Sequence, residues 1–216
     1  MPEWNIELTS KLESYGFMQS PHDHSTPTTS LGGDCSPCSL LERYSTLGLF
    51  FPVGSSFQLT AYFDSDCDSC IESRLSTIGY CIFFGGSLVC WKTKKQATVS
   101  CSSVEAEYRS MGTTVCELLW NSYLLKDFGI PIDSAIPFHH DNKSAIHITE
   151  NPVFHECTKH LDIDCHLVRD HFKCGFIHPH HTLSAQQVAN LFTKALPVAT
   201  FGCRLSKLGM VSHAPT

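Results

Sequence analysis

Apolar residues recur with the period of an α-helix between residues 103 and 126. The positions that carry this pattern are Ala106, Met111, Val115, Leu118 and Leu119. A spacing close to 3.6 residues places apolar side chains on one helix face, and Ser102 can cap the first turn. Gly129 and Pro131 then follow in the order that ends helices. The stretch predicts a long amphipathic helix, and Trp120, at helical spacing, is predicted to join the core.

Apolar runs on both sides of this helix predict five strands. Three precede it, at residues 57–64, 78–84 and 87–91, and Gly85-Gly86 between the last two is a hairpin signal because glycine accepts positive φ. The other two end at Asp141 and lie at residues 176–179. Further helices are predicted at residues 143–150, 158–173 and 184–196. Strands first, then strands alternating with helices, predict an α/β (α+β) fold with helices flanking a mixed five-stranded sheet.

Three of the predicted elements each carry a carboxylate at one end. Asp64 closes the first strand, Glu107 lies one turn into the long helix, and Asp141 directly follows the fourth strand. Mg²⁺ prefers oxygen ligands and keeps open positions for the phosphate of a substrate. The pattern therefore predicts a divalent metal site if the fold brings these three side chains together.

Several short motifs around these acids make the pattern more specific. They are FDSD at 63–66, SSVEAEYRSM at 102–111, HDNKSA at 140–145, KHLDIDCHLVRD at 159–170 and FTKAL at 192–196. In this order they resemble the ribonuclease H domain of copia-type retrotransposon Pol polyproteins. The resemblance implies a ribonuclease H-like fold and an ancestral enzyme that hydrolyses the RNA strand of RNA–DNA hybrids, with two Mg²⁺ or Mn²⁺ ions as cofactors.

By this resemblance, Asp64, Glu107 and Asp141 match the first three metal-binding acids of the family, with Asp64 bridging the two ions. The fourth acid is missing, because the family pattern resembles Gln-Leu-Ala-Asp-Ile-Leu-Thr-Lys and Asn190 stands here in place of the aspartate. An amide oxygen can coordinate a cation but carries no charge. We therefore expect weaker binding of the second ion and slow or absent turnover.

A histidine in a late loop of the family is expected to help the product leave. His181 aligns with it by resemblance, and the nearby His178 and His180 leave that assignment open.

The charge balance bears on whether the chain binds nucleic acid. Its formal net charge is -6, the wrong sign for affinity based on phosphate neutralisation. Candidate contacts to an RNA–DNA hybrid nevertheless cluster locally. They are Lys92, Lys94, Lys95, Asn142, Lys143, Lys159 and His160. We expect weak binding, and for the three lysines after Trp91 ordinary surface solubility is an equal alternative.

The resemblance implies that the chain divides into two parts. Residues 47–212 are expected to form the ribonuclease H-like domain. Residues 1–46 are expected to be a truncated reverse transcriptase remnant and linker, because residues 1–20 resemble a polymerase helix and residues 24–37 are rich in turn formers. The paired aspartates of a polymerase metal site have no counterpart. An internal deletion and a gene model that skips the polymerase core both explain this.

Two other functional hypotheses stay open, and the 12 cysteines bear on one of them. No signal-peptide pattern and no apolar run of ~18 residues is present, so we expect an intracellular, cytoplasmic protein with reduced thiols and no membrane partner. Cys35/Cys38 and Cys67/Cys70 have the spacing of tetrahedral zinc ligands, which makes a zinc-binding protein one alternative. A catalytically dead remnant that acts at most as a nucleic-acid-binding module is the other.

Overall fold

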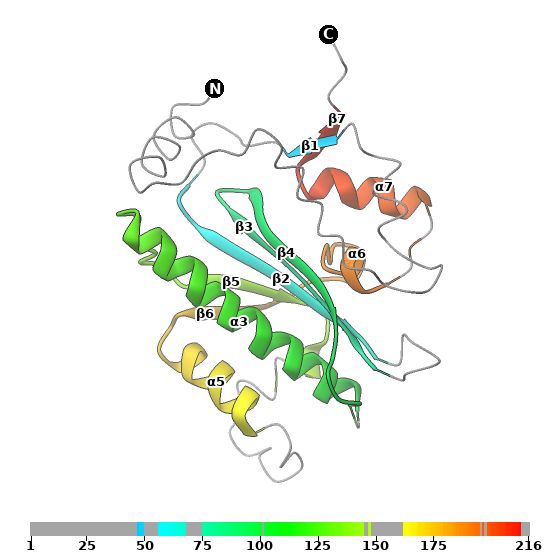
Figure 1. Cartoon of the computed structure of the whole chain (residues 1–216), viewed down its shortest axis with the longest axis horizontal. Coiled ribbons are helices and arrows are strands. Elements are labelled where there is room, and N and C mark those ends of the chain that lie inside the picture. Colours follow the sequence, from blue (N-terminus) through cyan, green and yellow to red (C-terminus); the bar gives the residue numbers. More distant parts are fainter. Residues whose placement is uncertain are drawn as a thin grey trace.

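A mixed five-stranded sheet forms the centre of the protein and carries helices on both faces (Figure 1). The computed structural model describes residues 47–49, 56–67, 75–100, 102–144, 147, 162–194, 196 and 198–212. The strands are β2 (Leu59–Asp66), β3 (Thr77–Phe84), β4 (Ser87–Lys95), β5 (Ile136–His140) and β6 (Ile177–His181). Their order is β4-β3-β2-β5-β6, antiparallel from β4 to β2 and parallel from β2 to β6. The predicted mixed sheet is confirmed.

The two faces of the sheet bury separate apolar cores. On one face, α3 (Ser103–Asp127) and α5 (Asp162–Lys173) cover the inward residues of β2, including Leu59, Ala61 and Phe63. On the other face, α6 (Asn190–Thr193) and α7 (Val198–Lys207) cover Cys81 and Phe83 of β3. Because β3 is covered on both sides, its sequence is a continuous apolar run without polar alternation.

The long helix α3 begins where the sequence predicts. The Ser102 hydroxyl accepts a hydrogen bond of 3.1 Å from the Glu105 backbone N–H, and the chain leaves the helix through Gly129 at φ 76. The core prediction for Trp120 is wrong, since its side chain is 60% exposed. Two residues past the buried Leu118 correspond to a rotation of about 200° around the helix axis, which points the indole away from the sheet.

The hairpin between β3 and β4 has the predicted turn. Gly85 and Gly86 have φ values of 58 and 81, which only glycine adopts readily. The strand after the turn runs to Lys95, four residues further than predicted. Lys92, Lys94 and Lys95 therefore belong to a strand.

The final helix predicted at residues 184–196 is wrong in extent, because α6 spans four residues. Before it the chain makes separate turns, such as that closed by the 2.7 Å hydrogen bond from the Gln186 N–H to the Leu183 carbonyl. The buried Gln187 side chain donates to the Phe63 carbonyl at 2.9 Å and accepts from the Ala189 N–H at 3.3 Å. These contacts compete with a continuous helix, and apolar periodicity does not reveal them.

Other boundaries follow from the described residues. The predicted helix at 158–173 is present from Asp162, and residues 143, 144 and 147 are helical within the predicted 143–150. The helix α7 was not predicted. A short strand β1 (Leu47–Leu49) pairs antiparallel with β7 (Met210–Ser212). Among the helices of the described segments, none combines the length and the hydrophobicity needed to cross a membrane.

Candidate metal centre

The parallel strands β2 and β5 separate at their carboxyl ends, and the candidate site lies there. Their pairing register places Ala61 opposite Phe138 and Tyr62 opposite His139. Beyond it, the Gln187 amide donates to the Phe63 carbonyl at 2.9 Å and to the His139 carbonyl at 3.4 Å, so it bridges the two strands. Carboxyl ends of neighbouring parallel strands are where open α/β sheets form ligand sites.

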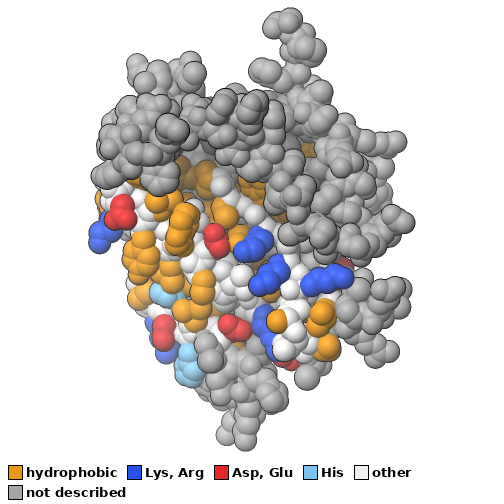
Figure 2. Space-filling view, viewed as in Figure 1, with side chains coloured by type: hydrophobic (Ala, Val, Ile, Leu, Met, Phe, Trp, Pro, Cys, Tyr) orange, Lys and Arg blue, Asp and Glu red, His pale blue; other side chains and the backbone are white. Residues whose placement is uncertain are grey.

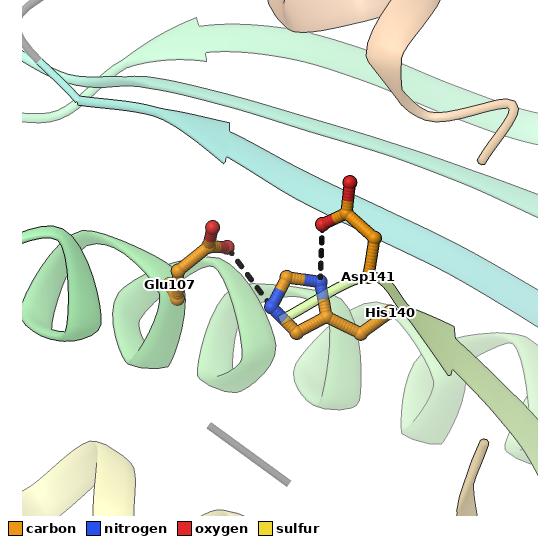
Figure 3. Close-up of side chains that lie close together, drawn as sticks. All are labelled: Glu107, His140 and Asp141. Carbon is orange, nitrogen blue, oxygen red and sulfur yellow. Dashed lines mark ion pairs between the residues drawn. The ribbon is translucent and has the colours of Figure 1, made fainter. Parts of the chain in front are cut away.

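Glu107 and Asp141 meet around the imidazole of His140 (Figure 3). One potential ligand atom of each residue lies within 4.8 Å of those of the other two. The Nε2 atom of His140 is 3.3 Å from Oε2 of Glu107, and its Nδ1 atom is 3.8 Å from Oδ1 of Asp141. Burial lowers the pKa of the His140 imidazole.

Asp64 on β2 is not one of these three residues, and its carboxylate is held by Thr193, the last residue of α6, and by Lys194, which follows it. The Asp64 side chain is fully buried. Thr193 donates a short hydrogen bond to Oδ2, and the Lys194 ammonium lies 3.2 Å from Oδ1. The Ser110 hydroxyl of α3 donates to the Asp64 backbone carbonyl at 3.0 Å, which fixes the long helix against β2. Burial raises the pKa of Asp64, and Lys194 and Thr193 oppose this effect.

Glu107 shows the electrostatic cost of bringing these acids together. Burial raises the pKa of its carboxyl to about 9, and the negative charges of Asp64 and then Asp141 contribute to this shift. Its Oε2 atom is buried and forms no hydrogen bond with the described residues. A divalent cation fits this donor set, because it would compensate the charges and take up the free oxygen. Glu107 and Asp141 are the residues placed to hold such an ion, with Asp64 beside them.

Asn190, which stands in place of the fourth acid, is the first residue of α6. Its side chain is buried and its Oδ1 atom accepts a hydrogen bond of 2.8 Å from the Lys194 ammonium. Its Nδ2 atom donates to the Ser184 carbonyl at 3.2 Å. The structure therefore places Asn190 next to Asp64 through a shared lysine.

Comparison with known proteins connects this geometry to a family. No protein-family model matches the chain. It is 34% and 35% identical, over 169 residues each, to the retrovirus-related Pol polyproteins from transposons RE2 and RE1 of Arabidopsis thaliana. Among solved structures it is similar to LC11-RNase H1 isolated from compost, with a TM-score of 0.50, 12% identity and coverage of 64% of this chain and 94% of that one. The chain is a ribonuclease H-fold relative of retrotransposon Pol polyproteins.

The resemblance drawn from the motifs is thereby confirmed. The aligned part covers 78% of this chain and 12% of each polyprotein, so the chain spans a small share of the length of these relatives. What those polyproteins do as a whole is therefore not carried over to this ribonuclease H-like chain.

Two further residues contact Asp141: His181, the last residue of β6, and Ser184, which follows that strand. The Ser184 hydroxyl donates to Oδ2 at 2.6 Å, and Nε2 of His181 lies 3.2 Å from the Asp141 backbone carbonyl. His181 is exposed. His178 and His180 are exposed too, but their contacts are with each other and with His139, along the open face of the sheet.

The candidate nucleic-acid contacts are spread over two places in the ribonuclease H fold. Asn142 and Lys143 directly follow Asp141, and the Ser144 N–H donates to Asn142 Oδ1 at 2.9 Å. Lys92, Lys94 and Lys95 are exposed on β4, and Figure 2 shows Lys and Arg side chains gathered over this strand. Lys159 and His160 lie outside the described residues, as do three of the four cysteines of the zinc hypothesis.

Sequence reasoning missed three side chains that shape the site. His140 continues the inward alternation of Ile136 and Phe138 along β5, which was a readable signal. Lys194 follows Asn190 by four residues, the spacing of neighbours on a helix. Thr193 carried no separate signal, because its role depends on how closely α6 approaches β2.

Proposed function

We propose that the chain hydrolyses the RNA strand of RNA–DNA hybrids with Mg²⁺ or Mn²⁺ at the site formed by Asp64, Glu107 and Asp141. The observation that supports this is that Glu107 and Asp141 lie together around His140, with Asp64 close enough for its negative charge to act on both. The chain's relation to retrotransposon Pol polyproteins supports the substrate class. The products would be 5'-phosphate and 3'-hydroxyl ends.

The residues of the chain position oxygen ligands and exclude water. Thr193 orients Asp64, and Ser184 orients Asp141, so neither carboxylate has to be ordered when a cation or substrate arrives. When bound, divalent ions would activate water and neutralise charge at the scissile phosphate. Glu107 is buried against His140, which keeps that side of the site dry.

The exposed groups around this cluster would meet the substrate. Lys143 and Asn142 lie beside Asp141 and would contact the sugar-phosphate backbone, which positions a strand without reading its sequence. His181 lies at the mouth of the site, where it would assist departure of the cleaved strand. Asn190 would slow the reaction, since it contributes no charge to the binding of a second ion.

The test is a cleavage assay of the purified full chain on a labelled RNA–DNA hybrid, with Mg²⁺ and with Mn²⁺. We expect slow cleavage that Asp64→Asn abolishes. The matched control is Asp170→Asn, which removes an exposed carboxylate on α5 and should leave the rate unchanged.

Wild-type protein that folds but cleaves no faster than Asp64→Asn in both metals would rule out the enzymatic proposal. The uncharged Asn190 then favours the second candidate, a non-catalytic module that binds hybrids. A gel-shift titration of the same protein with the same hybrid measures that binding directly.

A further inference from the structure

The Lys194 ammonium occupies the space between two residues of the candidate metal centre. It lies 3.2 Å from Oδ1 of Asp64 and 2.8 Å from Oδ1 of Asn190. Its side chain is 37% exposed, so the charged end reaches inward from the rim of the site. A positive charge thus stands between the first metal-site acid and the position at which the family resemblance implies the fourth.

The packing of α6 against the sheet determines where Lys194 lies. The ideal Cβ of an alanine at Gly79 would lie 2.6 Å from the Thr193 side chain and 2.7 Å from Cβ of Phe192, so the absence of a side chain there lets α6 approach β3. The Lys194 backbone N–H donates to the Asn190 carbonyl at 3.1 Å, which closes the turn. The backbone position of Lys194 is therefore fixed by the packing of α6 and by this turn.

The net charge of this site therefore differs from that of a site with four ionised acids. When ionised, Asp64, Glu107 and Asp141 carry three negative charges, and Asn190 carries none. Counted over these four residues and Lys194, the net charge is minus two, which a single divalent ion neutralises. A second ion would bring an excess of positive charge into a partly buried site, where unbalanced charge is costly.

We propose that Lys194 takes the place of one of the two cations, so that this chain binds a single divalent ion, on the side of Glu107 and Asp141. The inference rests on the proposed metal site and deepens it. It assigns Lys194 a positioning role, in which a fixed ammonium holds the Asp64 carboxylate that a metal ion would otherwise hold.

The experiment counts bound ions in the metal-free full chain by calorimetric titration with Mn²⁺, and needs no substrate. Wild type should saturate at one Mn²⁺ per chain. The double variant Asn190→Asp with Lys194→Met should saturate at two. Lys194→Met alone should bind its first ion about tenfold more tightly, because a nearby positive charge is removed.

Control variants distinguish an effect of the Lys194 charge from a loss of folding. Lys194→Arg keeps the positive charge and should retain one ion, and Lys126→Met removes an exposed lysine at the far end of α3 and should change nothing. Thermal unfolding of each variant reports whether it folds.

A wild-type protein that takes up two ions overturns the inference, and this result does not depend on any variant. A Lys194→Met protein that folds and binds Mn²⁺ with unchanged affinity also overturns it. Folded wild type that binds no Mn²⁺ at all overturns the proposed metal site together with this inference.

Discussion

Glu107 is the residue at which burial and like charge act together. Its carboxyl is covered by α3 and β5, and the neighbouring acids add to the effect of burial, so the pKa rises to about 9 in the metal-free protein. Its ordinary value is near 4.5. At neutral pH the folded, metal-free chain therefore holds a proton on Glu107 that the unfolded chain releases.

This difference predicts the pH dependence of stability. Below about pH 4.5 both states are protonated at this residue; between there and about pH 9 only the folded state is, so the free energy of unfolding falls as pH rises. We expect urea unfolding in EDTA to show this decline, and Glu107→Gln to flatten it. Saturating Mg²⁺ should also flatten it. The same slope in Glu107→Gln and in the surface control Asp133→Asn would contradict the assignment.

Asn190 lacks the negative charge that the family resemblance implies at its position, and a substitution tests the effect of that charge. We expect Asn190→Asp to raise the Mn²⁺-supported cleavage rate about tenfold, which corresponds to ~1.4 kcal/mol of transition-state stabilisation. Asn121→Asp makes the same chemical change on the outer part of α3 and should have no effect. An unchanged rate in Asn190→Asp would show that the amide does not limit the reaction.

At the scale of elements, the contact between α6 and β3 sets the geometry of the site. Gly79 faces Thr193, Phe192 and the Ala189 carbonyl, all of which an added methyl group would meet within 3.2 Å. Gly112 in α3 faces the Asp164 carboxylate, whose nearest oxygen would lie 2.7 Å from an added Cβ. The difference is that the aspartate side chain can rotate away, whereas the residues of α6 are fixed by the fold.

We therefore expect Gly79→Ala to destabilise the protein by about 1–3 kcal/mol, the usual cost of overpacking, and to weaken Mn²⁺ binding by displacing α6. Gly112→Ala should cost less, because alanine also favours the helix by ~1 kcal/mol over glycine. Chemical denaturation measures both. Equal losses in the two variants would argue against a special role for the approach of α6.

The helices and strands also show which features of the fold could be predicted from the sequence. The strands, the hairpin and the long helix were predictable, because each depends on local periodicity, a cap or a glycine turn. The short α6 was not, because the buried Gln187 amide bonds to two different strands and interrupts the helical pattern. Of the candidate site, the three acids could be found because each lies in or directly after a predicted strand or helix, although β2 continues two residues past Asp64. The spacing of Lys194 from Asn190 was a readable signal, but its contact with Asp64 was not, since that contact depends on how α6 packs at Gly79.

At the scale of the whole molecule, β4 provides a basic surface on an acidic protein. Asp64 lies opposite Gly79, which lies opposite Thr93, so Lys92 and Lys94 flank a position two strands away from the metal centre, about 10 Å at the usual strand spacing. This distance would suit contact with the backbone of a nucleic acid, the proposed substrate.

Replacing Lys92 and Lys94 with glutamine should weaken hybrid binding and reduce the slope of log affinity against log salt by about one per lysine. Fluorescence anisotropy at several salt concentrations measures this. The paired replacement of Lys126 and Lys173, exposed lysines on the helices, serves as the control. Equal slopes for both pairs would assign the β4 lysines to solubility.

The pairing of β1 with β7 brings the first and last described strands together (Figure 1). Hydrogen-bonded neighbours lie about 5 Å apart, so the polypeptide enters and leaves this fold at almost the same point. A domain whose two ends lie next to each other can be inserted into a longer polypeptide without moving the flanking parts away from each other.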